Sequence, residues 1–222
     1  KILITNYCRI KQLILIVYQK QFLTRMTFTI AVSTRLSSAV GYKEQRDSIS
    51  RDWIKLFNNL SINNYILLPN MGTDMLNAYC DYHSVNGFLL TGGDVIGNDI
   101  MRDEVEFAAL NIAKDKSLKV LGICRGMQII SSFFGGTLKS VDGHLATRHK
   151  INDSSSRNVN SYHTYAIDKL PECFKVIYKS QDNSIESISH NILPWHGCMW
   201  HPERDEFIHP MDLKMIKSLF SL

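Results

Sequence analysis

The sequence has no long hydrophobic run, no low-complexity tract and no internal repeat. Its early apolar stretch, residues 13–18, is only about six residues long, whereas a membrane-spanning helix needs about 20. No small-residue cleavage site follows this stretch, so we expect neither a membrane anchor nor an export signal. With 45% apolar and 21% charged residues among 222, the composition excludes disordered, collagen-like and coiled-coil chains and is typical of a globular protein.

Cysteine is scarce and irregularly placed. The cysteines are odd in number, widely spaced and never in a C-x-x-C pair: Cys8, Cys80, Cys124, Cys173 and Cys198. This pattern supports neither a disulfide framework nor a structural zinc site. We therefore expect a reducing, cytoplasmic environment, in which each thiol is either a buried apolar group or a reactive one.

An excess of charge is also lacking, apart from one segment. The net charge is +4, yet residues 1–25 contain five Lys and Arg and no Asp or Glu. The remainder of the chain is therefore close to neutral, which argues against a nucleic-acid partner. We predict that residues 1–25 form a basic extension outside the native core, that Met26 is the natural start, and that residues 26–222 form one domain.

From Met26 onward, short apolar strands alternate with helix-length amphipathic segments. The expected strands are residues 28–32, 65–68, 87–91, 119–123, 174–178, 185–189 and 197–200. The expected helices are residues 47–60, 73–82, 102–114 and a segment after Pro210, whereas residues 142–158 are polar and expected to form a loop. This alternation predicts an α/β fold, with a mostly parallel central sheet and helices on both faces.

The segment from Lys119 to Ile130 places a cysteine between a strand and a helix. Gly122 and Gly126 flank Cys124, and glycine permits a sharp turn in which a Cβ would clash; this is the arrangement of a nucleophile elbow. At a helix N-terminus, the dipole and the unpaired N–H groups favour the thiolate, which is the attacking form. A buried, inert cysteine in a tight turn is the alternative interpretation of this motif alone.

A Thr-Gly-Gly turn follows the strand expected at residues 87–91. Because Gly92 and Gly93 have no side chains, their backbone N–H groups can point at an oxyanion. Together with the amide of Arg125, the residue after Cys124, this turn would complete an oxyanion hole with two donors. By itself the turn is better explained as the end of a strand.

A third motif, Trp200-His201-Pro202-Glu203, lies near the end of the chain. In an extended conformation His201 and Glu203 project to the same side, so the carboxylate can hold the imidazole in one tautomer while the other nitrogen faces a thiol. Pro202 stiffens that spacing. The three motifs together predict a catalytic triad of Cys, His and Glu, although this one alone also fits a surface turn with a chance ion pair.

In this order, the three motifs resemble the class I (triad) glutamine amidotransferase family, over nearly all of residues 26–222. The resemblance implies a flavodoxin-like α/β domain without a cofactor or a metal. It also implies specific roles: a Cys124 nucleophile, a His201 base and acid, a Glu203 that orients it, an oxyanion hole from the Gly93 and Arg125 amides, and substrate contacts from Gly92, Gln128, Ser161, Tyr162 and His163.

Within this family, Arg102-Asp103-x-x-Glu106 and Asn160-Ser161-Tyr162-His163 are similar to the γ-glutamyl amide hydrolases. The short segment 95–101 and the stretch 180–184 look more like the γ-glutamyl-CDP-amidate hydrolases of bacterial capsule phosphoramidate biosynthesis. The resemblance therefore implies hydrolysis of a γ-glutamyl C–N bond through a γ-glutamyl thioester, with γ-glutamyl-CDP-amidate as the expected small-molecule substrate.

Three alternatives stay open. One is a hydrolase of γ-glutamyl-γ-aminobutyrate or another γ-glutamyl-amine. Another is a glutaminase subunit that delivers ammonia to a separate synthase, and the third is a non-enzymatic member of the fold.

The polar region after residue 138 invites two further interpretations. His144 and His149, with Asp142 and Asp153, fit no common metal-site spacing, so we expect a solvated loop and no metal. The same region carries basic residues that would suit a phosphate-bearing substrate. We nevertheless favour a charged surface loop for these residues: Lys139, Arg148, Lys150 and Arg157.

Overall fold

The computed structural model describes residues 28–222. The predicted basic extension, residues 1–25, and Cys8 lie outside the described residues, as does the predicted start at Met26. Among the helices of residues 28–222, none combines the length and the apolar character needed to cross a membrane. The cysteines of this part of the chain are all free thiols: Cys80, Cys124, Cys173 and Cys198.

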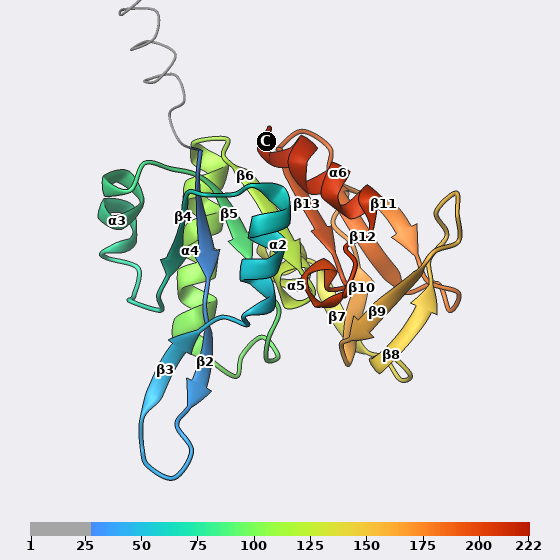
Figure 1. The fold of residues 1–222 in the computed structure, drawn as a ribbon, viewed down its shortest axis with the longest axis horizontal. Helices are drawn as coiled ribbons and strands as arrows, with labels where there is room; N and C mark the ends of the chain where they lie inside the picture. Colours follow the sequence, from blue (N-terminus) through green and yellow to red (C-terminus); the bar gives the residue numbers. More distant parts are fainter. Residues whose placement is uncertain (1–27) are drawn as a thin grey trace, which may run out of the picture.

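A seven-stranded sheet forms the centre of the molecule (Figure 1). In spatial order its strands are β11 (Phe174–Lys179), β12 (Ile185–His190), β13 (Trp195–Cys198), β6 (Lys119–Ile123), β5 (Val85–Leu90), β1 (Thr29–Ser33) and β4 (Tyr65–Leu68). The five strands from β13 to β4 are parallel, whereas β12 and β11 are antiparallel to their neighbours. The prediction of a mostly parallel central sheet is therefore confirmed.

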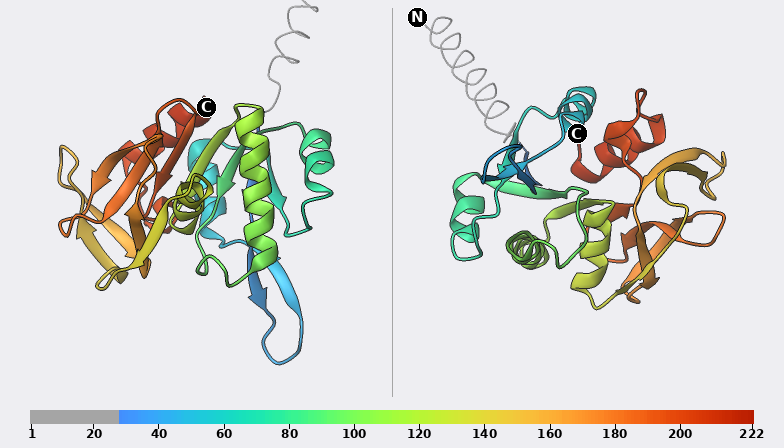
Figure 2. Two further views of the ribbon diagram at one scale, coloured as in Figure 1. Left: turned by 180° about the vertical axis from the view of Figure 1, so that it is seen from behind. Right: turned by 90° about the horizontal axis from the view of Figure 1, so that it is seen from below.

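Helices cover both faces of the sheet, as Figure 2 shows from behind and from below. The helices are α2 (Asp52–Leu60), α3 (Leu76–Tyr82), α4 (Ile100–Asp115), α5 (Arg125–Phe133) and α6 (Pro210–Phe220). One apolar cluster joins α3, α4 and α5 to one face, and a second joins α2 and α6 to the other. Because both faces are covered, the central strands are almost continuously apolar.

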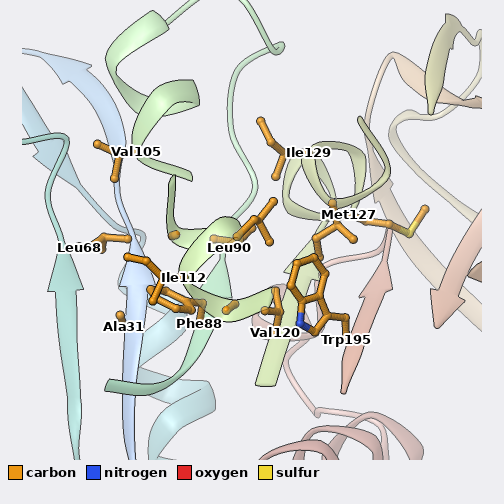
Figure 3. Packing of buried hydrophobic residues seen from close by; sticks show 14 of the residues in the cluster. Ala31, Leu68, Phe88, Leu90, Val105, Ile112, Val120, Met127, Ile129 and Trp195 are labelled. Carbon is orange, nitrogen blue, oxygen red and sulfur yellow. The ribbon is translucent and has the colours of Figure 1, made fainter. Parts of the chain in front are cut away.

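The first of these clusters surrounds the middle of the sheet (Figure 3). Phe88 from β5 and Val120 from β6 are fully buried there, and Met127 from α5 packs with them beside Trp195 from β13. The cluster thus holds α5 firmly on the strands that precede it, which fixes the start of that helix relative to the sheet edge.

Three small antiparallel sheets flank the central one, and none of them was predicted. They pair β2 (Arg35–Ser38) with β3 (Gln45–Ser48), β7 (Thr137–Ser140) with β10 (Tyr165–Lys169), and β8 (Leu145–Lys150) with β9 (Asn158–Tyr162). Two expectations are corrected by them. The helix expected from residue 47 begins only at Asp52, because residues 45–48 pair with β2, and the loop expected at 142–158 contains β8 and the start of β9.

Candidate active site

The three sequence motifs meet at one edge of the central sheet. Strands β5, β6 and β13 are parallel neighbours, so their carboxyl ends lie side by side, and each of the three motifs follows one of them. The approach is close: a Cβ added to Gly92 would lie 2.5 Å from Cε1 of His201 and 3.5 Å from Cβ of Cys124. A side chain at position 92 would therefore occupy the space between the thiol and the imidazole.

Cys124 lies in the sharp turn that the sequence predicted. Its φ of 53° and ψ of −108° are unusual for a residue other than glycine. A Cβ on Gly122 would lie 2.4 Å from the backbone of Gly126, and a Cβ on Gly126 would lie 2.1 Å from the carbonyl oxygen of Leu90. Glycine is thus required at both positions. Helix α5 begins directly after Cys124, and the first amides of this helix have no intrahelical partner.

His201 and Glu203 form a buried pair. The His201 Nδ1 lies 2.6 Å from Glu203 Oε1, which leaves Nε2 for a hydrogen bond with Cys124. Burial alone would lower the pKa of His201, but the charge of Glu203 and the bond to Cys124 outweigh it and raise this pKa to about 9. An imidazolium at neutral pH stabilises a neighbouring thiolate.

This pairing was predicted from the sequence for the wrong reason. Residues 202–204 form a 3-10 helix, not an extended strand. A helical turn after Pro202 brings the Glu203 carboxylate back to the imidazole, and proline is well suited to the first position of such a turn.

Strand β9 supplies two contacts to His201. Asn160 brackets its main chain, since Asn160 Nδ2 donates to the carbonyl at 2.8 Å and Oδ1 accepts from the amide at 2.8 Å. Two residues on, and so on the same face of the strand, Tyr162 meets the imidazole edge-on with 5.7 Å between ring centroids. No role was predicted for the Asn160 side chain; alternation along the strand was the signal that could have found it.

The other residues predicted to contact substrate are occupied within the protein. Ser161 Oγ donates to the carbonyl of His144 at 2.6 Å, and Gln128 Nε2 donates to the carbonyl of Tyr165 at 2.9 Å. His163 is buried and faces other histidines. These contacts hold the three side chains within the protein, and their predicted role in substrate binding stays a prediction.

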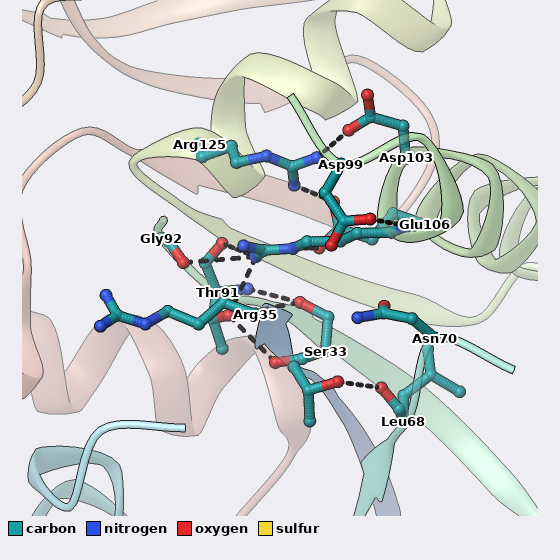
Figure 4. Close-up of polar contacts among 12 residues, drawn as sticks. Ser33, Arg35, Leu68, Asn70, Thr91, Gly92, Asp99, Asp103, Glu106 and Arg125 are labelled. Atoms are coloured by element: carbon teal, nitrogen blue, oxygen red, sulfur yellow. Dashed lines mark hydrogen bonds and ion pairs between the residues drawn. The ribbon is translucent and has the colours of Figure 1, made fainter. Parts of the chain in front are cut away.

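A buried arginine supports the glycine turn (Figure 4). Arg102, from α4, donates through Nη2 to the carbonyls of Thr91 at 2.9 Å and Gly92 at 3.3 Å. Its Nε is 3.0 Å from Glu106 Oε1 on the same helix. Arg102 is 2% exposed and Glu106 is 0% exposed. This buried ion pair therefore holds the guanidinium of Arg102 in place against the carbonyls of the turn.

Arg125 is anchored by the same helix. Its buried guanidinium forms ion pairs with Glu106 and Asp103. The Arg125 side chain is therefore turned away from Cys124, and the oxyanion role predicted for this residue requires only its main-chain amide.

The basic residues of the polar region lie mostly on exposed strands, and one of them is buried. The Arg157 side chain is 8% exposed and lies 2.8 Å from Asp153 and 2.7 Å from Asp212. Arg148, on β8, pairs with Asp205 at 2.8 Å. The expectation of a charged surface loop is wrong for Arg157, which is buried between two carboxylates, whereas Arg148 is exposed as expected but lies on a strand.

Two other guanidinium groups lie near the site. Arg35 follows β1, and its Cβ would be 3.5 Å from a Cβ at Gly93; Figure 4 shows its guanidinium turned away from the buried ion pairs. Arg204 lies 4.4 Å from the ring centroid of Tyr162. Arg35 is exposed, and the Arg204 side chain is 30% exposed with its Nε 3.8 Å from Glu203 Oε1, so both guanidinium groups can still reach an anionic ligand.

Known proteins share both the sequence and the fold of this chain. The sequence profile of the family "Glutamine amidotransferase class-I" matches residues 73–220. Gamma-glutamyl-CDP-amidate hydrolase from Campylobacter jejuni is 30% identical over 204 residues, covering 87% of this chain and 98% of that protein. A subunit of the glutamine-hydrolyzing GMP synthase from Methanococcus maripaludis is 30% identical over 147 residues, covering 62% of this chain and 73% of that protein.

Solved structures show the same architecture. A GMP synthase subunit from Thermoplasma acidophilum superposes with a TM-score of 0.66 at 18% identity and covers 88% of this chain and 93% of its own. A glutamine amidotransferase from Thermotoga maritima superposes with a TM-score of 0.59 at 13% identity and covers 88% of this chain and 83% of its own. The flavodoxin-like architecture predicted from the sequence is confirmed.

Proposed function

Because the chain belongs to the class I glutamine amidotransferase family, we propose that it is a cysteine-dependent hydrolase that cleaves γ-glutamyl C–N bonds and releases glutamate. One observation carries the proposal. Cys124 stands at the start of α5, hydrogen-bonded to a histidine whose other ring nitrogen lies 2.6 Å from a buried glutamate. This arrangement combines a nucleophile, a proton carrier and an orienting charge.

In the proposed reaction, the Cys124 thiolate attacks the γ-carbonyl carbon, and the amides of Gly93 and Arg125 donate to the resulting oxyanion. The C–N bond then breaks as His201 gives its proton to the departing nitrogen, which leaves a γ-glutamyl thioester on Cys124. His201 next accepts a proton from water, the hydroxide attacks the thioester, and glutamate and the free thiol are formed. Glu203 keeps the imidazole oriented through both proton transfers.

We propose γ-glutamyl-CDP-amidate as the substrate, and with it a place in capsule phosphoramidate biosynthesis. The similarity to the hydrolase from Campylobacter jejuni supports this, since it spans 98% of that protein. So do Arg35 and Arg204, which place exposed cations near Gly93 and Tyr162. Guanidinium groups at these positions suit the diphosphate of a nucleotide-linked substrate.

The test measures glutamate release from glutamine, γ-glutamyl-γ-aminobutyrate and γ-glutamyl-CDP-amidate. Cys124→Ser is expected to lower turnover by about 10³-fold or more, whereas Cys173→Ser, the same change at a thiol outside the site, is expected to leave it unchanged. Full turnover by Cys124→Ser would refute the mechanism. A kcat/KM for the CDP-linked compound no higher than that for glutamine would refute the substrate assignment alone.

The two arginines allow a second test of the substrate. Arg35→Gln and Arg204→Gln should each raise KM for γ-glutamyl-CDP-amidate by about tenfold, because each removes one charge-assisted hydrogen bond. Their KM for glutamine should not change, since glutamine has no phosphate. Arg51→Gln, the same change at an exposed arginine that precedes α2, is the control.

A glutaminase subunit is the second candidate, favoured by the similarity to the GMP synthase subunits from Methanococcus maripaludis and Pyrococcus furiosus. In that function the departing nitrogen is ammonia, which a separate synthase would consume. A glutaminase rate that rises only when the synthase is added would support it. Full turnover of γ-glutamyl-CDP-amidate by the isolated chain would favour the free-standing hydrolase.

A further inference from the structure

A buried cluster of imidazoles lies between the β8–β9 hairpin and the central sheet. His144 precedes β8, His149 lies within it, His163 follows β9, and Glu186 lies in β12. The ring centroid of His144 is 4.6 Å from that of His149 and 4.7 Å from that of His163. Glu186 is 0% exposed, and the side chains of His144 and His163 are 6% and 1% exposed. The proposed reaction uses none of these side chains.

The outer hydrogen bonds of two rings fix where their protons are. His144 Nε2 lies 2.9 Å from the Asp182 carboxylate, and His163 Nδ1 lies 3.0 Å from the carbonyl of Tyr165. A carboxylate and a carbonyl only accept hydrogen bonds, so both of these nitrogens carry hydrogen. In the neutral rings, His144 Nδ1 and His163 Nε2 then present lone pairs to each other across 3.2 Å, an arrangement that requires a proton or a metal cation between them.

Glu186 adds a third electron-rich atom to this space. Its Oε1 lies 3.6 Å from His144 Nδ1 and 3.6 Å from His163 Nε2. With the 3.2 Å between the nitrogens, a point equidistant from the three atoms is about 2.0 Å from each, which is the length of a zinc–nitrogen or zinc–carboxylate bond. Neither oxygen of Glu186 has a hydrogen bond of acceptable geometry.

His149 contacts the other oxygen of Glu186. Its Nε2 lies 3.3 Å from Glu186 Oε2, and neither of its ring nitrogens has a hydrogen-bond partner. Ligand atoms of His144, His149 and Glu186 all lie within 4.8 Å of one another. His149 and Glu186 thus contact each other without good hydrogen-bond geometry, and a cation shared between them would satisfy both groups.

We propose that His144, His149, His163 and Glu186 bind one zinc ion. Three imidazoles and a carboxylate are ligands that zinc accepts, and four protein ligands leave no open position, as in structural zinc sites. Asp182 and the Tyr165 carbonyl are the outer partners that orient two of the ligands.

The ion ties the β8–β9 hairpin to β12. Tyr162 immediately precedes His163. The ion therefore also fixes the end of β9, where Tyr162 lies beside His201. The burial of His144 corrects the expectation of a solvated loop in this region, and the proposed site replaces the expectation that no metal binds.

The experiment measures zinc binding by the full chain, independently of turnover. Chelator-stripped protein is dialysed against zinc, and bound metal is counted by mass spectrometry. Affinity is measured by competition with a chromophoric chelator. We expect about one zinc per chain, at least about 100-fold weaker binding in His163→Asn and Glu186→Gln, and about tenfold weaker binding in Asp182→Asn. His83→Asn, the same change at the end of α3, should bind as the wild type does.

Zinc bound no more tightly by the wild type than by Glu186→Gln would overturn the proposal and identify the cluster as a histidinium–glutamate ion pair. Cobalt substitution of the wild type covers the case in which the variants do not fold. Intense visible bands of four-coordinate Co²⁺ are expected, and the weak spectrum of hexaaqua cobalt would overturn the proposal equally. Neither result bears on the hydrolase, because no step of its reaction passes through this site.

Discussion

Glu203→Gln removes one negative charge beside His201 and keeps nearly the same shape and one hydrogen-bond acceptor for Nδ1. In the wild type the pKa of His201 is raised from 6.5 to about 9 although burial opposes the charged ring. This difference corresponds to about 3 kcal/mol in favour of the imidazolium. The charge of Glu203 is the largest of the favourable contributions, ahead of the hydrogen bond with Cys124.

We therefore expect the pKa of His201 to fall by about 2 units in Glu203→Gln, as is typical when a close opposite charge is removed. The imidazolium then persists only to about pH 7. At pH 8, kcat/KM should fall by about tenfold, because only about a tenth of the imidazole stays protonated one pH unit above its pKa. The alkaline limb of the pH profile should move from about 9 to about 7.

The assay is kcat/KM for glutamate release between about pH 5.5 and 10, together with the rate of alkylation of Cys124 by iodoacetamide over the same range. Alkylation reports the thiolate without any substrate. Glu206→Gln, the same chemical change three residues away at an exposed position, should leave both profiles unaltered. An alkaline limb that stays near 9 in Glu203→Gln would refute the conclusion that the Glu203 charge keeps His201 protonated.

Three further changes test the surroundings of the site. Gly126→Ala should destabilise the fold by about 3 kcal/mol in urea denaturation, because its Cβ would meet the Leu90 carbonyl at 2.1 Å; a loss below about 0.5 kcal/mol would contradict the rigid turn. Arg102→Lys should lower kcat by about tenfold with little change in KM, since lysine cannot hold the Gly92 carbonyl and Glu106 together. The stability that His201 contributes should be complete below pH 6.5 and disappear as the pH rises through about 9, measured as the urea midpoint of wild type against His201→Gln.

The strands that the sequence predicted best are those covered on both faces. Residues 65–68 and 119–123 are observed with the predicted bounds as β4 and β6, because a short apolar run between polar turns has little alternative in an α/β chain. Among the strands that were missed, β2, β3 and β8 are polar and largely exposed. Their pairing is set by neighbouring segments and leaves no hydrophobic period to recognise.

The candidate site was predictable wherever its chemistry is local in the sequence. The sharp turn at Cys124 was predicted from its two neighbouring glycines, Gly122 and Gly126. Glycine is needed there because close main-chain contacts leave no room for a side chain on either side of the cysteine. Asn160 was overlooked because its contact is with a main chain 41 residues away. No metal was expected at His144 and His149 because their spacing was judged along one loop with Asp142 and Asp153, whereas the carboxylate beside them, Glu186, comes from the central sheet.

Glu106 links the two sides of the proposed oxyanion hole. One of its oxygens accepts from Arg102, which holds the carbonyl of Gly92, and the other pairs with Arg125 at the start of α5. Because Glu106 is 0% exposed, neither ion pair can be replaced by water, and a shift of the carboxylate would move both donors together. A rigid hole is what catalysis of acyl transfer requires, since donors that are already in place need not reorganise as the oxyanion forms. In the proposed reaction, the buried charges of α4 would thus act through the backbone that they position.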